Sequence, residues 1–573
     1  MIPRSFQAIP PGMSALPQDL LALLAQRAAQ HPTRVAVCDL GRDCEATKSL
    51  TYAELLTKAA GTARQLELQG WAGRPVLLAA TSPTDFLTAF YGMLAAGSAP
   101  IPVSMGNSSR AGNRLVHIAS DADAAGMIVD SSLASRAGDM LRGVADSPPL
   151  AILSPRNVSE PKLCAGDPKR LAFLQYTSGS TSQPRGVRIS HANLLHNMAC
   201  VSQAMDLIGG GTIVSWLPLH HDMGLIGMTL LAQFQGGTAA LMRPVDFITR
   251  PLRWAQAITR HKAQFTGGPN LGLELLLRAA RAKGVEGLDL STLRGIANGA
   301  EPVRAETLHA CREVLGPAGL GEDIIVPCYG LAESTLIASG SSGIRHSILH
   351  ADAEELDAGT LTESLPGKET RDLVSCGGSL GHQEILIVNH KTRALCAEGE
   401  VGEIWLRGES VSEGYLNGDT ESFHQTTASG ESDCLRTGDL GALLDGNLYI
   451  TGRLKDLIVI AGRNLHPTDL EWVAERAHPN LKPGSTAAFG VETDEGEAPV
   501  ILIETDGKAS FEEICSQVTA EITAEFDCTP KEIIEVERGS IPRTTSGKVR
   551  RNTCKENYLA NQTNHLSESG KIS

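Results

Sequence analysis

The chain has 573 residues, and one hydrophobic core rarely organises more than about 250–300 residues, so we expect at least two folding units. Hydrophobic residues make up 42% and charged residues 20%, which is typical of soluble globular proteins, and the net charge of −15 disfavours nucleic acid and anionic membrane as partners. The twelve cysteines include no CxxC pair, and no stretch approaches the roughly 20 apolar residues of a membrane span. We therefore expect a cytoplasmic protein without a transmembrane segment.

Short apolar runs alternate with helical patterns from residue 19 onward, which is typical of a layered α/β fold. The predicted strands are 35–40, 75–80, 172–177 and 212–219, and the predicted helices are 50–70, 86–97 and 191–205. This order predicts the fold class α/β, with a large N-terminal domain of layered α/β subdomains over residues 1–454.

The pattern changes twice in the second half of the chain. Residues 341–372 are polar and rich in turn formers, so we expect a surface insertion there. Strand patterns return at 384–389, 402–408 and 447–452, and a strand and turn at 454–467 lead into alternating helices and strands. We expect a small C-terminal α+β domain at 455–556 and a disordered tail at 557–573.

A loop rich in small and hydroxyl residues follows the predicted strand 172–177. Its backbone N–H groups and hydroxyls suit phosphate oxygens, and Arg185 adds a cation. The alternative is a flexible surface linker. The phosphate-binding candidates are Thr177, Ser178, Gly179, Ser180, Thr181 and Arg185.

Two Gly-containing segments, NGAEPV at 298–303 and CYGLAEST at 328–335, suit a nucleotide. A nucleobase could lie against Tyr329, and Glu333 could hold Mg²⁺. The alternative is a strand, turn and helix with a capping glutamate. WLPLHHDMGLIG at 216–227 places two histidines at a predicted strand-to-helix junction, where a histidine pair taken alone is more often structural than functional.

Two later segments carry charge on Gly-rich turns. In LRTGDLG at 435–441, Asp439 is a natural acceptor for two ribose hydroxyls, with Arg453 nearby as a donor, although a simple turn aspartate is the alternative. In IPRTTSGKVRR at 541–551, Lys548 suits an anion clamp, and a solvated basic tail is the alternative.

In this order and spacing the segments strongly resemble the adenylate-forming superfamily over residues 20–555. FLQYTSGST, WLPLHHDMGLIG, NGAEPV, CYGLAEST and GRLKDLIVIAGRN resemble the fatty acyl-AMP ligases (FAALs) in particular. The insertion before LVSCGG stands where that subfamily carries a segment that hinders the domain rotation needed for CoA use. The resemblance implies ATP-dependent activation of a fatty acid and transfer to an acyl carrier protein, in polyketide, nonribosomal peptide or lipid biosynthesis.

The resemblance also implies roles for particular residues. Lys548 bridges the acid carboxylate and the α-phosphate, Glu333 holds Mg²⁺, and His221 lies beside the carboxylate. Lys455 is the hinge about which the small, mobile C-terminal domain rotates. The implied ATP/AMP-binding residues beyond the phosphate loop are Asn298, Gly299, Ala300, Glu301, Tyr329, Gly330, Ser334, Asp439 and Arg453. The implied acyl pocket includes Met223, Gly224, Met228, Gly267 and Gly268.

Two departures from the superfamily pattern bear on this interpretation. Ser182 and Arg185 replace a glycine and a lysine in the phosphate loop, a variation common in FAALs. Ala332 replaces a threonine that contacts the α-phosphate, so either Ser334 or Thr335 is expected to take that role. The rival hypotheses are a fatty acyl-CoA synthetase, a peptide-synthetase adenylation enzyme and a non-catalytic adenylate-binding scaffold.

Overall fold

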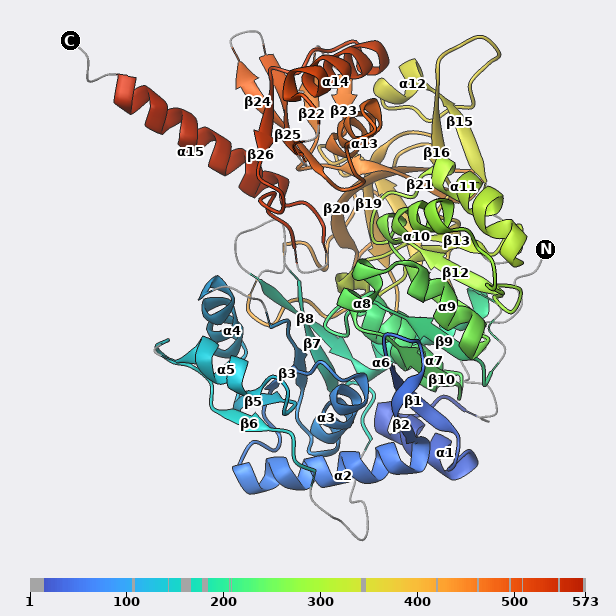
Figure 1. Ribbon diagram of the computed structural model, residues 1–573, viewed down its shortest axis with the longest axis vertical. Coiled ribbons are helices and arrows are strands. Elements are labelled where there is room, and N and C mark those ends of the chain that lie inside the picture. Colours follow the sequence, from blue (N-terminus) through green and yellow to red (C-terminus); the bar gives the residue numbers. More distant parts are fainter. Residues whose placement is uncertain are drawn as a thin grey trace.

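The computed structural model describes residues 15–569 with gaps at 106–108, 143, 156–165, 178–183, 206, 208, 342–346, 419–420, 461–462, 494–495, 506, 508 and 545–546; the side chains of 109–110 and 561–569 also fall outside the description. Figure 1 shows the C-terminal elements above a larger body built from the rest of the chain. Across the described ranges, no helix combines the length and apolar character that crossing a membrane requires.

A nine-stranded sheet is the centre of the large domain, in the order β17-β14-β13-β12-β11-β9-β10-β1-β2. The run from β13 to β1 is parallel, and the edges are antiparallel. The strands are β1 Val35–Leu40, β2 Ala46–Thr51, β9 Thr212–Ser215, β10 Thr238–Leu241, β11 Phe265–Gly268, β12 Gly295–Asn298, β13 Ile325–Tyr329, β14 Ser339–Gly340 and β17 Gly378–Ser379.

Helices pack on both faces of this sheet, as buried parallel strands require. Two separate apolar cores result, one beneath each layer of helices. The first layer contains α1 Leu20–Gln30, α6 His191–Ala204, the π-helix Met223–Leu230 and α7 Leu231–Phe234. The second contains α8 Pro244–Thr249, α9 Leu252–His261, α10 Asn270–Lys283 and α11 Ala305–Leu315.

A smaller parallel sheet, β4-β3-β5-β6, lies beside the first core and carries its own helices (Figure 1). A capping box between Thr51 and Glu54 begins α2, its longest helix. Its elements are α2 Tyr52–Gln69, β3 Val76–Ala79, α3 Pro83–Ala95, β4 Pro100–Pro102, α4 Ser109–Asp121, β5 Gly126–Val129, α5 Ala134–Leu141 and β6 Leu150–Ile152. A hairpin of β7 Leu171–Thr177 and β8 Arg185–Ser190 follows.

An antiparallel sheet, β18-β19-β20-β21, closes the large domain. The predicted insertion folds as a two-stranded unit with a short helix rather than as an irregular loop. These elements are β15 Ile348–Asp352, α12 Ala353–Asp357, β16 Thr370–Val374, β18 Glu384–Val388, β19 Gly402–Arg407, β20 Leu435–Leu444 and β21 Asn447–Arg453.

The C-terminal unit has its own apolar core between two helices and the sheet β24-β25-β26. Its elements are β22 Ile458–Ile460, β23 Arg463–Leu465, α13 Pro467–Ala477, β24 Thr486–Thr493, β25 Gly496–Glu504, α14 Phe511–Phe526, β26 Glu532–Val536 and α15 Arg551–Ser569. The small α+β fold predicted from the sequence is confirmed.

Two expectations differ from the structure. The expected disordered tail is helical as far as Ser569, and residues 570–573 lie outside the described residues. The first part of this helix packs against the sheet through Cys554 and Tyr558, and the Tyr558 and Phe489 rings lie 5.7 Å apart. The sequence pattern also missed β8, which stands between the phosphate loop and α6 and pairs with β7.

Candidate active site

The carboxyl ends of three parallel strands form one edge of the large sheet. There β11 ends at Gly268, β12 at Asn298 and β13 at Tyr329, and β11–β12 and β12–β13 are neighbours. Ligands of open α/β sheets bind outside these ends. Segments widely separated in the sequence therefore meet at one edge.

Tyr329, Asp439 and Arg453 form one polar group from three strands. The Tyr329 hydroxyl donates to Asp439 Oδ2 at 2.8 Å, and Arg453 Nε lies 3.1 Å from Asp439 Oδ1. Asp439 and Arg453 are register partners across β20 and β21, which sets their separation. Burial raises the pKa of Tyr329 well above its usual range, so the phenol stays protonated. The structure thus brings together the predicted adenine-flanking ring and the predicted ribose pair.

The turn after β12 depends on small residues. A Cβ on Gly299 would lie 2.5 Å from the Cys328 carbonyl oxygen, and Ala300 has a φ of +70°. Asn298 is fully buried, and neither polar atom of its side chain has a hydrogen-bond partner among the described residues. Buried amides are almost always satisfied, so this one fits a bound group that offers both a donor and an acceptor, as ATP does.

Glu301 is half-buried at this turn. Its Oε1 accepts a hydrogen bond from Leu271 N at 2.5 Å. Burial raises the pKa of Glu301, and the positive charge of Lys548 opposes that rise.

The segment after β13 turns sharply. A Cβ on Gly330 would lie 1.7 Å from the Leu336 carbonyl oxygen, so no larger residue fits. Ser334 is fully buried, and its hydroxyl has no hydrogen-bond partner among the described residues, whereas Thr335 Oγ1 donates to the Ser410 carbonyl at 2.6 Å. Of the two expected substitutes for the missing threonine, Ser334 has the available hydroxyl.

Glu333 and Arg185 meet at one aromatic ring. The Tyr415 hydroxyl donates to Glu333 Oε1 at 2.6 Å, and the Arg185 guanidinium carbon lies 4.0 Å from the centroid of the Tyr415 ring. The predicted Mg²⁺ carboxylate therefore contacts the hydroxyl of Tyr415, and the predicted phosphate cation lies over its ring.

The β7–β8 hairpin carries the predicted phosphate loop. Thr177 ends β7 and is the register partner of Arg185, the first residue of β8. Ser178, Gly179, Ser180 and Thr181 lie outside the described residues. The hairpin therefore fixes both ends of that loop beside Tyr415.

His221 lies in the turn before the π-helix. Its backbone N–H donates to the Pro218 carbonyl at 3.2 Å, and its ring centroid is 4.6 Å from that of His220. Gln175 Nε2 donates to the His220 carbonyl at 2.9 Å, which ties this turn to β7. Burial lowers the pKa of His220 well below its usual value, so that ring is neutral at physiological pH.

The acyl-pocket candidates fall into two groups. The Met228 side chain packs over Gly267, with its Cε 2.8 Å from where a Cβ would stand, and Met223 begins the same π-helix. The small size of Gly224 and Gly268 serves internal packing: Gly224 lies against the Pro218 carbonyl, and Gly268 against two tryptophan rings.

Lys548 lies on an exposed turn of the C-terminal unit. Its backbone N–H donates to Thr544 Oγ1 at 3.0 Å, and Thr544 N donates back to the Lys548 carbonyl at 2.7 Å. This local turn presents the side chain without burying it.

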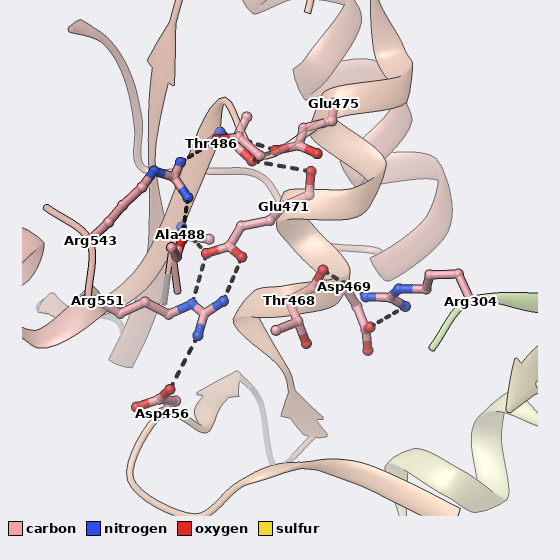
Figure 2. Close-up of polar contacts among 12 residues, drawn as sticks. Arg304, Asp456, Thr468, Asp469, Glu471, Glu475, Thr486, Ala488, Arg543 and Arg551 are labelled. Carbon is pink, nitrogen blue, oxygen red and sulfur yellow. Dashed lines mark hydrogen bonds and ion pairs between the residues drawn. The ribbon is translucent and has the colours of Figure 1, made fainter. Parts of the chain in front are cut away.

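A charge cluster holds the chain next to the predicted hinge Lys455 (Figure 2). Arg551 pairs with both carboxylate oxygens of Glu471, at 2.7 and 2.6 Å, and its Nη1 lies 3.4 Å from Asp456. These partners raise the pKa of Arg551, against the effect of burial. Asp456 is thus anchored to the C-terminal unit, while its neighbour Lys455 is exposed.

Several contacts join the C-terminal unit to the large domain, among them an ion pair between Arg476 Nη1 and Glu306 Oε1 at 3.2 Å. Arg304 donates to Asp469 Oδ1 at 2.8 Å and to the Thr468 carbonyl at 2.9 Å (Figure 2). In the insertion, Arg371 pairs with both oxygens of Asp357, and its guanidinium carbon lies 5.5 Å from the centroid of the Phe526 ring. The insertion therefore contacts the helix α14.

Sequence reasoning missed Tyr415 and Arg304. Tyr415 lies in SEGYLNG, where an aromatic residue in a turn-rich segment was the available signal. Arg304 follows NGAEPV directly, and its contact across the two domains has no signature in the sequence.

The chain is similar in sequence to known protein families and to individual enzymes. The model of the AMP-binding enzyme family matches residues 24–416, and that of the Disco-interacting protein 2-like AMP domain matches residues 455–568. The medium-chain-fatty-acid–[acyl-carrier-protein] ligase JamA of Moorena producens (strain JHB) is 34% identical over 94% of this chain and 95% of its own. The long-chain-fatty-acid–AMP ligase FadD26 of Mycobacterium bovis is 33% identical over 94% and 96%.

A solved structure from studies of fatty acyl-adenylate ligases from E. coli and L. pneumophila superposes with a TM-score of 0.85 at 31% identity, covering 96% of this chain and 98% of its own. The chain belongs to the family of AMP-binding enzymes, the adenylate-forming superfamily that its motifs predict. JamA and FadD26 are named as fatty acid ligases that use an acyl carrier protein or AMP, and a relative from Mycobacterium tuberculosis at 32% identity is named a putative fatty-acid–CoA ligase, FadD21. Together with the solved fatty acyl-adenylate ligase structure, these matches confirm the resemblance to FAALs and an adenylate-forming ligase activity.

Proposed function

We propose that this protein joins a fatty acid to AMP at the expense of ATP and then transfers the acyl group to the phosphopantetheine thiol of an acyl carrier protein. The observation that carries the proposal is the meeting of Tyr329, Asp439 and Arg453 in one polar group at the carboxyl edge of the sheet. The names of the relatives JamA and FadD26 support the choice of acid and acceptor.

In the first step a carboxylate oxygen of the acid attacks the α-phosphorus of ATP, and pyrophosphate leaves with its bonding electrons. Catalysis is chiefly positioning and charge neutralisation. Lys548 bridges the carboxylate and the α-phosphate, and Ser334 offers its hydroxyl to that phosphate. His221 lies beside the carboxylate.

Separate groups hold the ribose, the adenine and the phosphates of the nucleotide. Asp439 and Arg453 bind the ribose hydroxyls, and the Tyr329 ring flanks the adenine, with Gly299 and Ala300 at its edge. Residues 177–181 and Arg185 bind the β- and γ-phosphates. Mg²⁺ bound with ATP would neutralise phosphate charge, and Glu333 is the carboxylate that would hold it.

The second step requires the C-terminal domain to rotate about Lys455, which withdraws Lys548 and admits a thiol. The contact between Arg371 of the insertion and Phe526 of α14 supports a restricted rotation. A carrier protein presents its thiol on a long flexible arm, which suits such a restricted opening better than free CoA. The acyl chain enters beside Met228 and Gly267.

The test is incubation of the purified protein with ATP, Mg²⁺ and mixed C4–C18 acids, followed by mass spectrometry of acyl-AMP and measurement of pyrophosphate release. Lys548→Ala should lower the rate on the order of 10²–10³-fold, as removal of an oxyanion donor does. Lys531→Ala changes an exposed lysine of the same unit and should leave the rate unchanged.

In two further incubations, the enzyme with its acyl-AMP receives CoA in one and a holo carrier protein in the other. We expect acyl transfer to the carrier protein alone. Efficient acyl-CoA formation would establish an acyl-CoA synthetase instead, and the absence of acyl-AMP with every acid would favour the non-catalytic scaffold.

A further inference from the structure

Tyr415 links the two sides of the phosphate site. Its hydroxyl contacts the Glu333 carboxylate at 2.6 Å, and its ring supports the Arg185 guanidinium at 4.0 Å. The two partners come from segments almost 150 residues apart, and one side chain between them fixes their separation.

The position of Tyr415 is itself set from two directions. Its backbone bridges to Val187 of β8, and Leu416 N donates to the Gly186 carbonyl at 2.7 Å. On the other side its ring packs edge-on against Phe423, with centroids 5.2 Å apart. Tyr415 is thus attached both to the hairpin that carries the phosphate loop and to the apolar core of the β18–β21 sheet.

The chain around Tyr415 also holds the turn that carries Glu333. Ser412 N donates to the Glu333 carbonyl at 2.9 Å, and the Ser410 carbonyl accepts from Thr335 Oγ1 at 2.6 Å. With the Tyr415 hydroxyl, residues 410–415 therefore hold this turn at three points. The backbone of Glu333 is fixed by the segment, and its carboxylate by the phenol.

We propose that Tyr415 is a positioning residue for adenylate formation, whose hydroxyl orients the Glu333 carboxylate and whose ring fixes Arg185 beside the phosphates. The inference rests on the proposed function. The phenol occupies Oε1 and leaves the remaining acceptor capacity of the carboxylate for a cation; hydrogen bonds of this kind tune metal ligands by roughly 10–100-fold in affinity or activity. The ring attracts the guanidinium through its π-face and limits its rotamers.

Two substitutions separate the two parts of this role. Tyr415→Phe keeps the ring under Arg185 and removes only the hydroxyl. We expect its affinity for ATP in EDTA to equal that of the wild type, while the gain in ATP affinity on adding Mg²⁺ falls by roughly 10-fold. Tyr415→Leu removes the ring as well, and its ATP affinity in EDTA should also fall.

Isothermal titration with ATP, in EDTA and in Mg²⁺, measures both effects without catalysis. Tyr449→Phe is the matched control, because it removes a hydroxyl contact to Ser347 at 3.2 Å near the other end of the β20–β21 hairpin from Asp439. It should bind ATP as the wild type does. Thermal melting of Tyr415→Phe measures the stability that the hydroxyl contributes. A lower melting temperature with an undiminished Mg²⁺ gain would show that its role is purely structural.

Different results would contradict the role of the hydroxyl, the role of the ring and the proposed function. An undiminished Mg²⁺ gain in Tyr415→Phe would overturn the role of the hydroxyl, and equal ATP affinity of the Phe and Leu variants in EDTA would overturn the role of the ring. If the wild type binds MgATP but forms no acyl-AMP with any acid, the proposed function fails, and the titrations still decide the role of Tyr415.

Discussion

The Asp439 carboxylate has one polar and one charged partner, and a neutral side chain would bind both of them less strongly. It accepts from the Tyr329 hydroxyl and pairs with Arg453. Asp439→Asn keeps the size of the side chain but removes its charge. Because hydrogen bonds to a charged group contribute about 1.5–3 kcal/mol, the KM for ATP should rise roughly 10- to 100-fold, with little change in the KM for the acid.

Steady-state pyrophosphate release at varied ATP checks this prediction. Asp445→Asn makes the same change on the exposed turn of the same hairpin and should leave the KM for ATP unaltered. An unchanged KM for ATP in Asp439→Asn would show that the carboxylate does not bind the ribose.

The helix α13 carries a half-buried acid that makes the C-terminal unit sensitive to pH. Glu475 Oε1 accepts from Thr486 N at 3.1 Å and from Thr486 Oγ1 at 2.9 Å (Figure 2), yet burial raises the pKa of Glu475 to about 7. The folded state therefore binds this proton more tightly than the unfolded state. The contribution of Glu475 to the free energy of unfolding is largest at a pH below the pKa that Glu475 has in the unfolded state. It falls as the pH rises to about 7 and stays low above that.

Glu475→Gln keeps the accepting oxygen and removes the half-buried charge. At pH 8 it should raise the free energy of unfolding by an amount on the order of 1–3 kcal/mol, and at pH 5 the difference should largely vanish. Thermal denaturation at both pH values measures this. Glu513→Gln, on the exposed face of α14, is the control. Stabilisation of Glu475→Gln only at pH 5 would reverse the sign and refute the argument.

At the scale of the whole molecule, Arg304 links the two domains. Its guanidinium donates to Asp469 and to the Thr468 carbonyl, and lies 5.3 Å from the centroid of the Trp472 ring. Arg304→Ala removes these contacts, so the C-terminal domain should leave this orientation more often. Trypsin should then cut the chain several-fold faster at the exposed Arg453 and Lys455. A rate increase of this size corresponds to a loss of about 1 kcal/mol from the free energy that holds the two domains in this orientation.

Limited proteolysis followed by mass spectrometry locates and times the cut. Arg312→Ala, on the helix α11 that follows Arg304, removes contacts to Glu322 and Asp323 within the large domain and should not change the rate. Equal cutting rates for the wild type and Arg304→Ala would show that Arg304 does not hold the domains together.

Much of the fold could be predicted from the sequence because helices and strands follow local periodicity. The expected strand at 35–40 is β1, and the expected helix at 50–70 is α2. NGAEPV and CYGLAEST likewise predicted nucleotide contacts at turns, and both lie at or beyond strand ends. The strand β8 has no such signal, since its formation depends on pairing with β7.

The sequence by itself determined the α/β class, the two-unit organisation and the residue types suited to binding ATP. Only the tertiary structure decided which of those residues meet: Tyr329 contacts Asp439 across 110 positions, and Glu333 contacts Tyr415 across 82. The reason is that periodicity and turn chemistry act over a few residues, whereas these contacts depend on how whole sheets pack against one another.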